Sequence, residues 1–411
     1  MLRWSGIGVF VCALACAMPG AAAPSLLGVS SDQGQGAPGA VAPAYTGDLP
    51  DPFVYHDDSG FLAIGTNTGG ANVPLLTSPD LGAWVWAGDA MPKLASWVKP
   101  GMTWAPTVLR RGSAWVMYYT ARETASGRQA VGCAVASSPR GPFVDDAAAP
   151  LISTPQEGGA IDASPFVDDD GQAYLLWKGD SNAINEQTHI YIQPLAADGR
   201  SLTGARTSLA VRDRPWEQTL VEAPAMVKQG GRYHLFYSGG WWESTSYGVG
   251  HAVADRVTGP FRKTSVDGPV LGSHGAEQGP GGAEFFAGPG GLWAAYHAWT
   301  APNVGYAHGG ARRLHVAPVS WNGDEPVFGK AGAPVVEPAQ PGAGQPAAVQ
   351  PVQPGTAQPA QAGAGQPGAG QPAQPGPVAR RAPGGFGREM QVLVALVVRL
   401  LEGALAAGRS L

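Results

Sequence analysis

One pattern recurs five times along the chain and limits the possible fold more than any other feature. Each copy has a glycine at a predicted tight turn followed by an apolar, strand-like run, which is typical of a β-hairpin. The turn glycines are 52, 59, 60 and 60 residues apart, at Gly60, Gly112, Gly171, Gly231 and Gly291. A hairpin cannot bury both faces alone, so hairpins repeated at a long period indicate a repeat array. We therefore predict an all-β fold, a five-bladed β-propeller formed by residues 46–330.

Acidic residues occupy similar positions in three of the repeats. Nine residues before the turn glycines stand Asp51, Thr103, Asp162, Glu222 and Gly282. Aligning the repeats on the proline near each first strand moves this match by one or two residues, but the acids still begin their strands. The first strand of each propeller blade lines the central channel. We therefore expect Asp51, Asp162 and Glu222 to converge in the channel from three blades.

Three converging carboxyl groups suit two kinds of chemistry. In glycoside hydrolysis, one carboxyl group protonates the departing oxygen, and a second activates water or attacks the sugar. A third acid near the proton donor raises the pKa of the donor by like-charge repulsion. Alternatively, three carboxylates around water form a Ca²⁺ site. Acids at turns are usually solvated, and we interpret residues 57–58 and 168–170 in that way.

Four short segments begin successive repeats: residues 50–54 (PDPFV), 103–106 (TWAP), 161–166 (IDASPF) and 221–224 (VEAP). In this order and spacing they resemble the signature segments of glycoside hydrolase family 43, and the resemblance covers about residues 46–330. That family comprises five-bladed propellers that act on arabinose- and xylose-containing polysaccharides. The resemblance therefore implies the same fold and a polysaccharide or oligosaccharide substrate for this chain.

The resemblance also implies catalytic roles for the three acids. Asp51 matches the general base, Glu222 matches the general acid, and Asp162 matches the residue that tunes and orients the acid. The family inverts configuration, so a water molecule should fit between Asp51 and the sugar, with the two carboxyl groups ~6.5–9.5 Å apart. Glu222 should then be protonated at the working pH and Asp51 ionised.

Several other residues are candidates for substrate binding. Trp104 and Phe53 adjoin the motif positions and are predicted to form an apolar wall for the sugar, although Phe53 fits packing between blades equally well. Arg312 or Arg313 resembles a family arginine near the substrate hydroxyls, and we assign Arg312. The pair at residues 241–242 (WW) is either a stacking surface at the rim or part of a blade core.

One departure from the family concerns a metal ion. Many members carry a histidine after a Gly-Pro-Gly segment in the fifth blade, where it helps to bind a metal ion in the channel. Here Gly282 stands at that place, after residues 279–281 (GPG). We therefore expect no required cofactor and assign no metal ligand. A channel Ca²⁺ held by Glu284 or His297 is the alternative.

The first 23 residues have the pattern of an export signal. Arg3 precedes a short apolar run and then small residues. The apolar run is shorter than the ~20 residues that span a bilayer, so we expect a secreted, extracellular protein without a transmembrane span. Retention at the membrane through Cys16 is the alternative.

Three other segments lie outside the predicted propeller. Residues 24–45 are small and polar and are predicted to be flexible. Residues 331–387 are mostly Pro, Gln, Gly and Ala and are predicted to form a disordered low-complexity linker. Residues 388–411 are predicted to form a short amphipathic helix, which Arg399 and Glu402 make too polar for a membrane span.

These features lead to one functional prediction and its alternatives. We predict a secreted, monomeric, inverting glycoside hydrolase that cleaves arabinose- or xylose-containing plant polysaccharides or oligosaccharides. An α-L-arabinofuranosidase or arabinanase is the first choice and a β-xylosidase the second, while a non-catalytic carbohydrate-binding propeller is the alternative of another class. A formal net charge of -5, with only 14% charged residues, gives no basic patch for nucleic acid. The sugar, the linkage and the choice between internal and terminal cleavage stay open.

Overall fold

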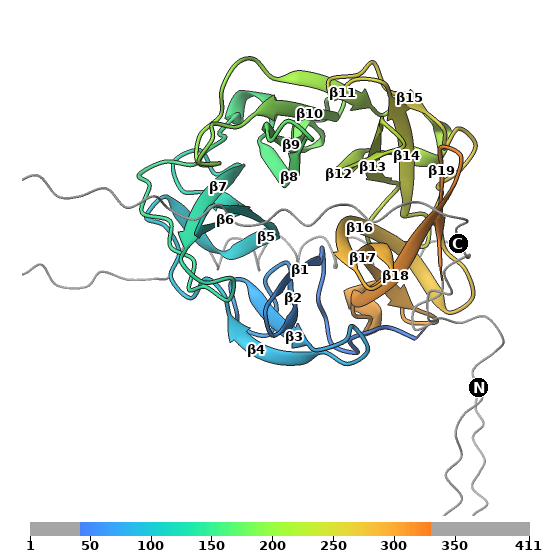
Figure 1. Cartoon of the computed structure of the whole chain (residues 1–411), viewed down its shortest axis with the longest axis horizontal. Coiled ribbons are helices and arrows are strands. Elements are labelled where there is room, and N and C mark those ends of the chain that lie inside the picture. Colours follow the sequence, from blue (N-terminus) through green and yellow to red (C-terminus); the bar gives the residue numbers. More distant parts are fainter. Residues whose placement is uncertain (1–41, 330–411) are drawn as a thin grey trace, which may run out of the picture. The chain divides into compact units, whose positions relative to one another are not determined.

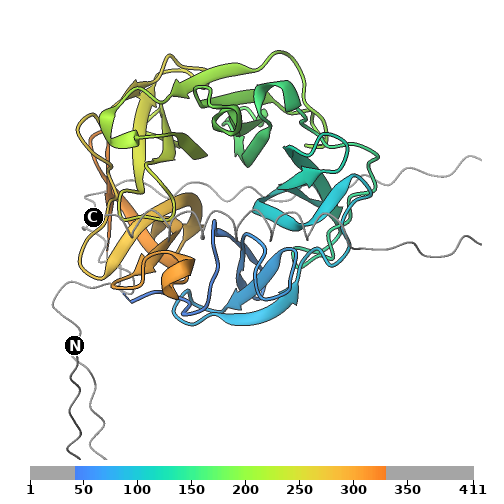
Figure 2. The same cartoon turned by 180° about the vertical axis from the view of Figure 1, so that it is seen from behind.

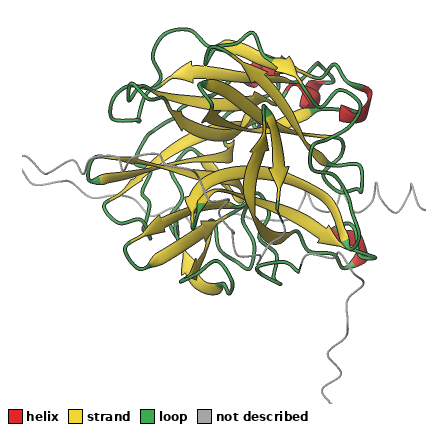
Figure 3. Ribbon diagram, turned by 45° about the vertical axis from the view of Figure 1, so that its right-hand side comes forward, coloured by secondary structure: helices red, strands yellow, loops and turns green. Residues whose placement is uncertain are grey.

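Each of the five predicted hairpins forms the two inner strands of a separate antiparallel sheet. The computed structural model describes residues 42–329, and in it the five sheets surround one axis (Figure 1). The reverse view shows the same closed ring (Figure 2), and the ribbon diagram shows that strands dominate it (Figure 3). The predicted all-β, five-bladed propeller is thereby confirmed.

Consecutive strands pair within each sheet, so the order of strands in a blade follows the order in the chain. The first blade contains β1 (Phe53–Asp57), β2 (Gly60–Ile64), β3 (Pro74–Ser78) and β4 (Val85–Asp89). The second contains β5 (Val98–Arg111), β6 (Ala114–Glu123) and β7 (Gln129–Ala136). The third contains β8 (Ala160–Val167), β9 (Ala173–Gly179), β10 (His189–Pro194) and β11 (Thr207–Val211).

The last two blades have four strands each. The fourth blade contains β12 (Val221–Gln229), β13 (Arg232–Gly239), β14 (Gly248–Ala254) and β15 (Arg262–Lys263). The fifth contains β16 (Glu277–Gly288), β17 (Gly291–Thr300), β18 (Arg313–Asn322) and β19 (Glu325–Phe328). Four short 3₁₀ helices lie in the connections, at Pro155–Glu157, Ser181–Ile184, Pro215–Glu217 and Tyr306–His308.

An irregular residue with left-handed backbone occurs at or just before the start of the regular pairing of every innermost strand. These residues have φ values of 50°, 41°, 57°, 48° and 60° and are Asp51, Ala105, Asp162, Ala223 and Gly282. In the second to fifth blades the pairing register shifts around this residue, as expected for a β-bulge. A positive φ is uncommon in residues other than glycine. Its recurrence in all five blades marks the structurally equivalent position.

This bulge corrects one detail of the sequence alignment. Counting nine residues back from the turn glycine aligns Asp51, Asp162 and Gly282 correctly. It misplaces Thr103 and Glu222, because the left-handed residues of their blades are Ala105 and Ala223. Glu222 therefore precedes the left-handed position of its blade, whereas Asp51 and Asp162 occupy that position in theirs.

Apolar packing between neighbouring blades forms five hydrophobic clusters, one at each interface. The cluster between the first and fifth blades closes the ring, and it includes Leu49, Val54, Phe286 and Leu314. Backbone hydrogen bonds support this closure, from Leu49 N to Arg312 O (2.9 Å) and from Ala44 N to Leu314 O (2.8 Å). The chain therefore already packs against the fifth blade two residues before the predicted start of the propeller.

Several predicted segments lie outside the described residues. They are the signal at 1–23, all but the last four residues of the segment 24–45, the linker at 331–387 and the helix at 388–411. Over residues 42–329, no helix is long and apolar enough to cross a membrane.

Candidate active site

A cavity of about 450 Å³ opens where the innermost strands of several blades begin. Its lining contains all three predicted catalytic acids together with the predicted binding residues Trp104 and Arg312. Residues from other parts of the chain complete the wall, and they include Asp48, Thr66, Met102, Trp242, Tyr247 and Tyr306. The structure thus brings together five of the six site residues that the sequence singled out.

Asp51 is held by contacts from three directions. Thr66 Oγ1 donates a hydrogen bond to Asp51 Oδ2 (2.6 Å), and Arg312 Nη1 lies 3.3 Å and 3.4 Å from Oδ1 and Oδ2. The Asp51 N–H donates to His297 Nδ1 (3.1 Å). Burial raises the pKa of Asp51, but the Arg312 charge, His297 and the Thr66 hydrogen bond outweigh it and hold the pKa below its usual value. Asp51 is therefore ionised over the whole range in which a general base would act.

Glu222 lies between a phenol and an ammonium group. Tyr247 donates a hydrogen bond to Glu222 Oε1 (2.8 Å), and Lys178 Nζ lies 3.4 Å from Glu222 Oε2. Lys178 is almost fully buried and also contacts Asp180 Oδ1 at 2.9 Å. These contacts fix both oxygens of the Glu222 carboxyl group in the cavity wall.

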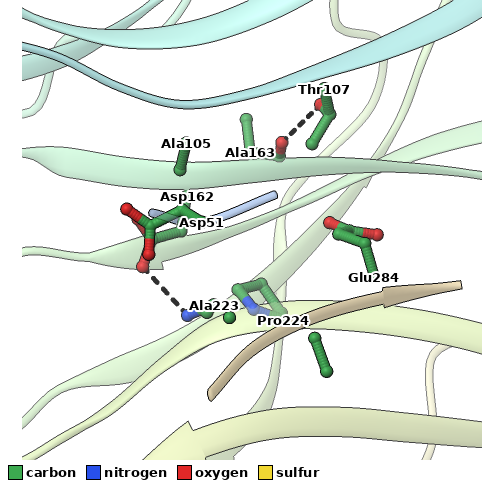
Figure 4. A pocket seen from close by; sticks show the side chains of 10 residues that line it. Asp51, Ala105, Thr107, Asp162, Ala163, Ala223, Pro224 and Glu284 are labelled. Carbon is green, nitrogen blue, oxygen red and sulfur yellow. Dashed lines mark hydrogen bonds between the residues drawn. The ribbon is translucent and has the colours of Figure 1, made fainter. Parts of the chain in front are cut away.

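Asp162 is tied to the strand that carries Glu222. Its Oδ2 accepts a hydrogen bond from the Ala223 N–H (2.9 Å), and Figure 4 shows this bond beside the Asp51 side chain. Burial and the Glu222 charge raise the pKa of Asp162 to about 8, against the opposing effects of Lys178 and the Ala223 N–H. The Asp162 carboxyl group therefore retains its proton at neutral pH.

Arg312 is surrounded by aromatic rings and a fourth acid. Its guanidinium lies over the Trp242 ring (4.8 Å), and its Nε donates to the Tyr306 hydroxyl (3.2 Å). Asp48 accepts hydrogen bonds from the Arg312 N–H (2.8 Å) and from the Tyr306 hydroxyl. The alternative, Arg313, instead donates to Thr300 Oγ1 (3.2 Å) and is not part of the cavity lining.

Phe53 is the predicted site residue that the structure does not place in the cavity. Its ring centroid lies 6.0 Å from that of Tyr55, and both pack in the cluster between the first and second blades. Side chains alternate along a strand, so Phe53 shares a face of β1 with buried Tyr55. The proposed apolar wall is therefore formed without Phe53.

Four residues of the site carried no sequence signal. Thr66, Lys178, Tyr247 and Asp48 lie outside the four motif segments, and their residue types are common. Tyr247 lies after a pair of tryptophans, which is the only nearby hint of a site in the sequence. These residues are found only by their contacts with the acids and with Arg312.

A second, much smaller cavity of about 20 Å³ shares Asp51, Asp162 and Ala223 with the first. Figure 4 shows that Glu284 lies apart from Asp51 and Asp162 in this space, which holds about one water molecule. Burial raises the pKa of Glu284 to about 8. Within residues 42–329, no three His, Cys, Asp or Glu side chains are grouped so that they could hold a metal ion.

The residues around Gly282 do not fit a channel metal ion of the kind that the resemblance suggests. A Cβ atom at Gly282 would lie 3.0 Å from His297 Nδ1 and 3.2 Å from Asp51 Oδ1. His297 Nδ1 already accepts the Asp51 N–H, and burial and the Arg312 charge lower the pKa of His297 to about 3. His297 is therefore a neutral, buried partner of the Asp51 backbone.

The site as a whole separates an ionised aspartate, Asp51, from a protonated one, Asp162, which lies beside Glu222. Asp51 belongs to the first blade, Asp162 to the third and Glu222 to the fourth. A proton acceptor and a proton donor held on different rigid elements meet the needs of acid–base hydrolysis of a bond placed between them.

Known glycosidases resemble this chain in sequence and structure. The chain matches the sequence model described as Glycosyl hydrolases family 43 over residues 41–327. It is 33% identical to the β-D-galactofuranosidase xynD of Aspergillus niger over 41% of this chain and 48% of that protein. The match thus spans about half of the length of the xynD protein. It is 26% identical to a probable arabinan endo-1,5-α-L-arabinosidase A of Aspergillus flavus, over 69% of this chain and 91% of that protein.

A solved structure agrees with this match. The crystal structure of a thermostable family-43 glycoside hydrolase superposes with a TM-score of 0.62 and 27% identity, over 72% of this chain and 96% of that chain. Because the family match covers more than half of the chain, the protein belongs to glycosyl hydrolase family 43, a family of inverting O-glycosyl hydrolases.

Proposed function

We propose that the protein is a secreted α-L-arabinofuranosidase or arabinanase, with Asp51 as general base and Glu222 as general acid. The coarser function, hydrolysis of arabinose- or xylose-containing substrates, follows from the family. The observation that supports the finer proposal most strongly is the cavity in which ionised Asp51 faces the same space as Glu222 and the protonated Asp162.

In the proposed reaction, a water molecule attacks the anomeric carbon of the sugar while Asp51 removes a proton from that water. The bond between the anomeric carbon and the glycosidic oxygen breaks, and Glu222 gives its proton to the departing oxygen. The configuration at the anomeric carbon is thereby inverted. Asp51 is left protonated and Glu222 ionised, and exchange with solvent restores both groups.

The polar wall of the cavity gives a basis for sugar recognition. Arg312 and Asp48 present donors and acceptors beside Asp51, and Trp104 supplies an apolar surface. Two of the curated relatives are named a β-D-galactofuranosidase and an arabinan endo-arabinosidase, and these names support an arabinofuranoside as the first choice. Another is named a putative β-xylosidase, which keeps a xyloside as the second choice. Export is proposed from residues 1–23 alone.

The test compares nitrophenyl α-L-arabinofuranoside, nitrophenyl β-xyloside and linear arabinan as substrates. We expect cleavage of the arabinose substrates, and a fall of about 10²- to 10⁴-fold in kcat for Asp51→Asn and Glu222→Gln with unchanged thermal unfolding. Proton NMR of the first-formed sugar should show the inverted anomer. Retained configuration, or wild-type activity in either variant, would contradict the proposed roles, and a preference for the xyloside would make the enzyme a β-xylosidase.

We also propose that no tightly bound Ca²⁺ is required. Gly282 has no side chain to offer, and His297 Nδ1 is engaged by the Asp51 N–H. Dialysis against EDTA should therefore leave kcat and the midpoint of thermal unfolding unchanged, and recovery of lost activity on adding Ca²⁺ would refute this proposal.

A further inference from the structure

We propose that Trp241 forms a binding platform for a second sugar unit of the substrate, next to the catalytic cavity. The proposal rests on the proposed glycosidase function and extends it to the length of the substrate. Trp241 and Trp242 lie in the connection between β13 and β14. The two neighbouring tryptophans have different surroundings, and this difference separates their roles.

Trp242 is part of the cavity wall. Its ring lies under the Arg312 guanidinium at 4.8 Å and stacks on Trp299, with ring centroids 6.3 Å apart and an interplanar angle of 26°. The ring of Trp242 is therefore already in contact with other protein groups. It shapes the catalytic cavity and holds Arg312, but it has little free face to offer to a further sugar.

Trp241 has the opposite surroundings. Its side chain is 44% exposed, and it is not part of the cavity lining. Its ring centroid lies only 6.0 Å from that of Trp242, at an interplanar angle of 41°. The large apolar ring of Trp241 is thus exposed to solvent and lies next to Trp242, which forms part of the cavity wall.

The connection that carries Trp241 is held in place by several contacts. Ser244 Oγ donates to Trp241 O (2.9 Å), and the Trp241 N–H donates to Ser246 Oγ (3.4 Å). Gly240 has a φ of 93°, and a Cβ atom at this position would collide with the carbonyl of Ser246. A conformation of this kind is closed to most other residues.

Two contacts fasten the same connection to the fifth blade. Trp299 Nε1 donates to Trp242 O (2.9 Å), and the Tyr306 N–H donates to Glu243 Oε1 (3.1 Å). The exposed ring is therefore presented by a preorganised segment, and little conformational entropy is lost when a ligand covers it.

Sugar rings have an apolar face of C–H groups and a polar edge of hydroxyl groups, so they pack face to face on exposed aromatic rings. Trp241 offers such a face next to Trp242, which lines the cavity proposed to hold the sugar whose bond is cut. The occupant we infer is the neighbouring pentose of an oligosaccharide or polysaccharide chain. A nitrophenyl glycoside, which has one sugar, has no unit to place there.

The experiment measures kcat/KM on α-1,5-linked arabinotriose and on nitrophenyl α-L-arabinofuranoside. For Trp241→Ala, kcat/KM for arabinotriose divided by kcat/KM for the nitrophenyl glycoside should fall about 3- to 10-fold, because KM for arabinotriose rises. Trp241→Phe should restore most of the ratio, because it keeps an aromatic face. Trp86→Ala is the matched control, since Trp86 is 40% exposed on β4 and does not line the cavity, and it should leave the ratio unchanged.

A binding measurement separates this inference from the proposed function. Calorimetry with arabinotriose on Glu222→Gln, with and without Trp241→Ala, should show about 3- to 10-fold weaker binding without the ring, whether or not the wild type cleaves the sugar. Equal binding by the two proteins, an unchanged kinetic ratio, or an equal loss in Trp86→Ala would overturn the proposed platform. Absence of cleavage by the wild type would count against the glycosidase proposal alone.

Discussion

Asp51 and Asp162 have the same side chain and the same left-handed backbone, yet their pKa values shift in opposite directions. Both are half-buried and partly desolvated, which raises the pKa of a carboxyl group. Asp51 has Arg312 and Thr66 as partners, and these stabilise its charge. Asp162 has the Glu222 carboxylate as its strongest neighbour, and Lys178 compensates for only part of that repulsion. Electrostatic surroundings therefore keep Asp51 ionised and Asp162 protonated at neutral pH.

Replacing Asp162 by Asn should change the alkaline limit of activity. The pKa of Asp162 is raised to about 8, so this carboxyl group is protonated below that pH and ionised above it. Asn stays neutral at every pH. In a plot of kcat/KM from pH 4 to pH 10, the limb near pH 8 that follows the ionisation of Asp162 in the wild type should therefore be absent in Asp162→Asn.

The matched control is Asp170→Asn, a substitution in the exposed turn between β8 and β9. It should leave the pH profile as in the wild type. An unchanged alkaline limb in Asp162→Asn would show that the activity does not depend on the ionisation of Asp162.

Sequence reasoning found the acids of the site but only some of their partners. Asp51, Asp162 and Glu222 could be predicted because each begins a repeated segment with a fixed relation to a turn glycine. Thr66 and Tyr247 could not be predicted, because they reach the acids from loops that have no pattern in common. The misassignment of Phe53 has a similar cause, since adjacency to a motif does not determine the face of the strand.

The innermost strands are the elements that build the site, and the left-handed residue that they share explains how the acids come to line the cavity. The left-handed residue interrupts the regular pairing at the end of the strand that faces the cavity, and it turns the side chain of Asp51 or Asp162 toward the axis. Spacing alone did not reveal this position in β5 and β12, because the number of residues between the bulge and the turn glycine varies between blades.

A substitution in β16 tests how closely these strands must approach one another. Gly281 pairs with His297, and a Cβ atom at Gly281 would overlap the ring of Tyr247. Gly281→Ala should therefore displace Tyr247 from Glu222 and lower kcat by about 10-fold or more, with a stability loss of about 1–3 kcal/mol. Kinetics and thermal unfolding measure the two effects.

Gly268→Ala is the control for this substitution, since no heavy atom lies within 4 Å of a Cβ atom there. It should leave kcat as in the wild type. Normal kcat in Gly281→Ala would mean that the hydrogen bond from Tyr247 to Glu222 is dispensable.

At the scale of the whole molecule, stability is distributed over five interfaces between blades. The repeat predicted the number of blades, because each hairpin needs neighbours to bury its faces. It did not predict how the ring closes, because the residues that join the first blade to the fifth lie before the first repeat. Leu49 and Ala44 make this connection through Arg312 and Leu314, and Figure 1 shows the first and fifth blades as neighbours.

Two equivalent substitutions distinguish the effect of the interface that closes the propeller from a general loss of stability. Leu49 and Leu175 are both fully buried, in the interfaces between the first and fifth and between the second and third blades. Each Leu→Ala change should cost about 2–5 kcal/mol in the free energy of unfolding. Leu49→Ala should also reduce kcat/KM at 25 °C, because the closing interface positions Asp51 relative to Arg312. Equal kcat/KM in the two variants would show that closure does not control the site.

The five left-handed positions also offer a route to redesign. Two of them hold aspartate, whereas Ala105, Ala223 and Gly282 carry no reactive group. Aspartate is already accommodated twice in this backbone conformation. A functional side chain introduced at Ala105 would therefore occupy a backbone position that the fold repeats in every blade. The chemistry of such a propeller then depends on which side chains occupy the five left-handed positions, and other side chains there would give the same fold a different catalytic activity.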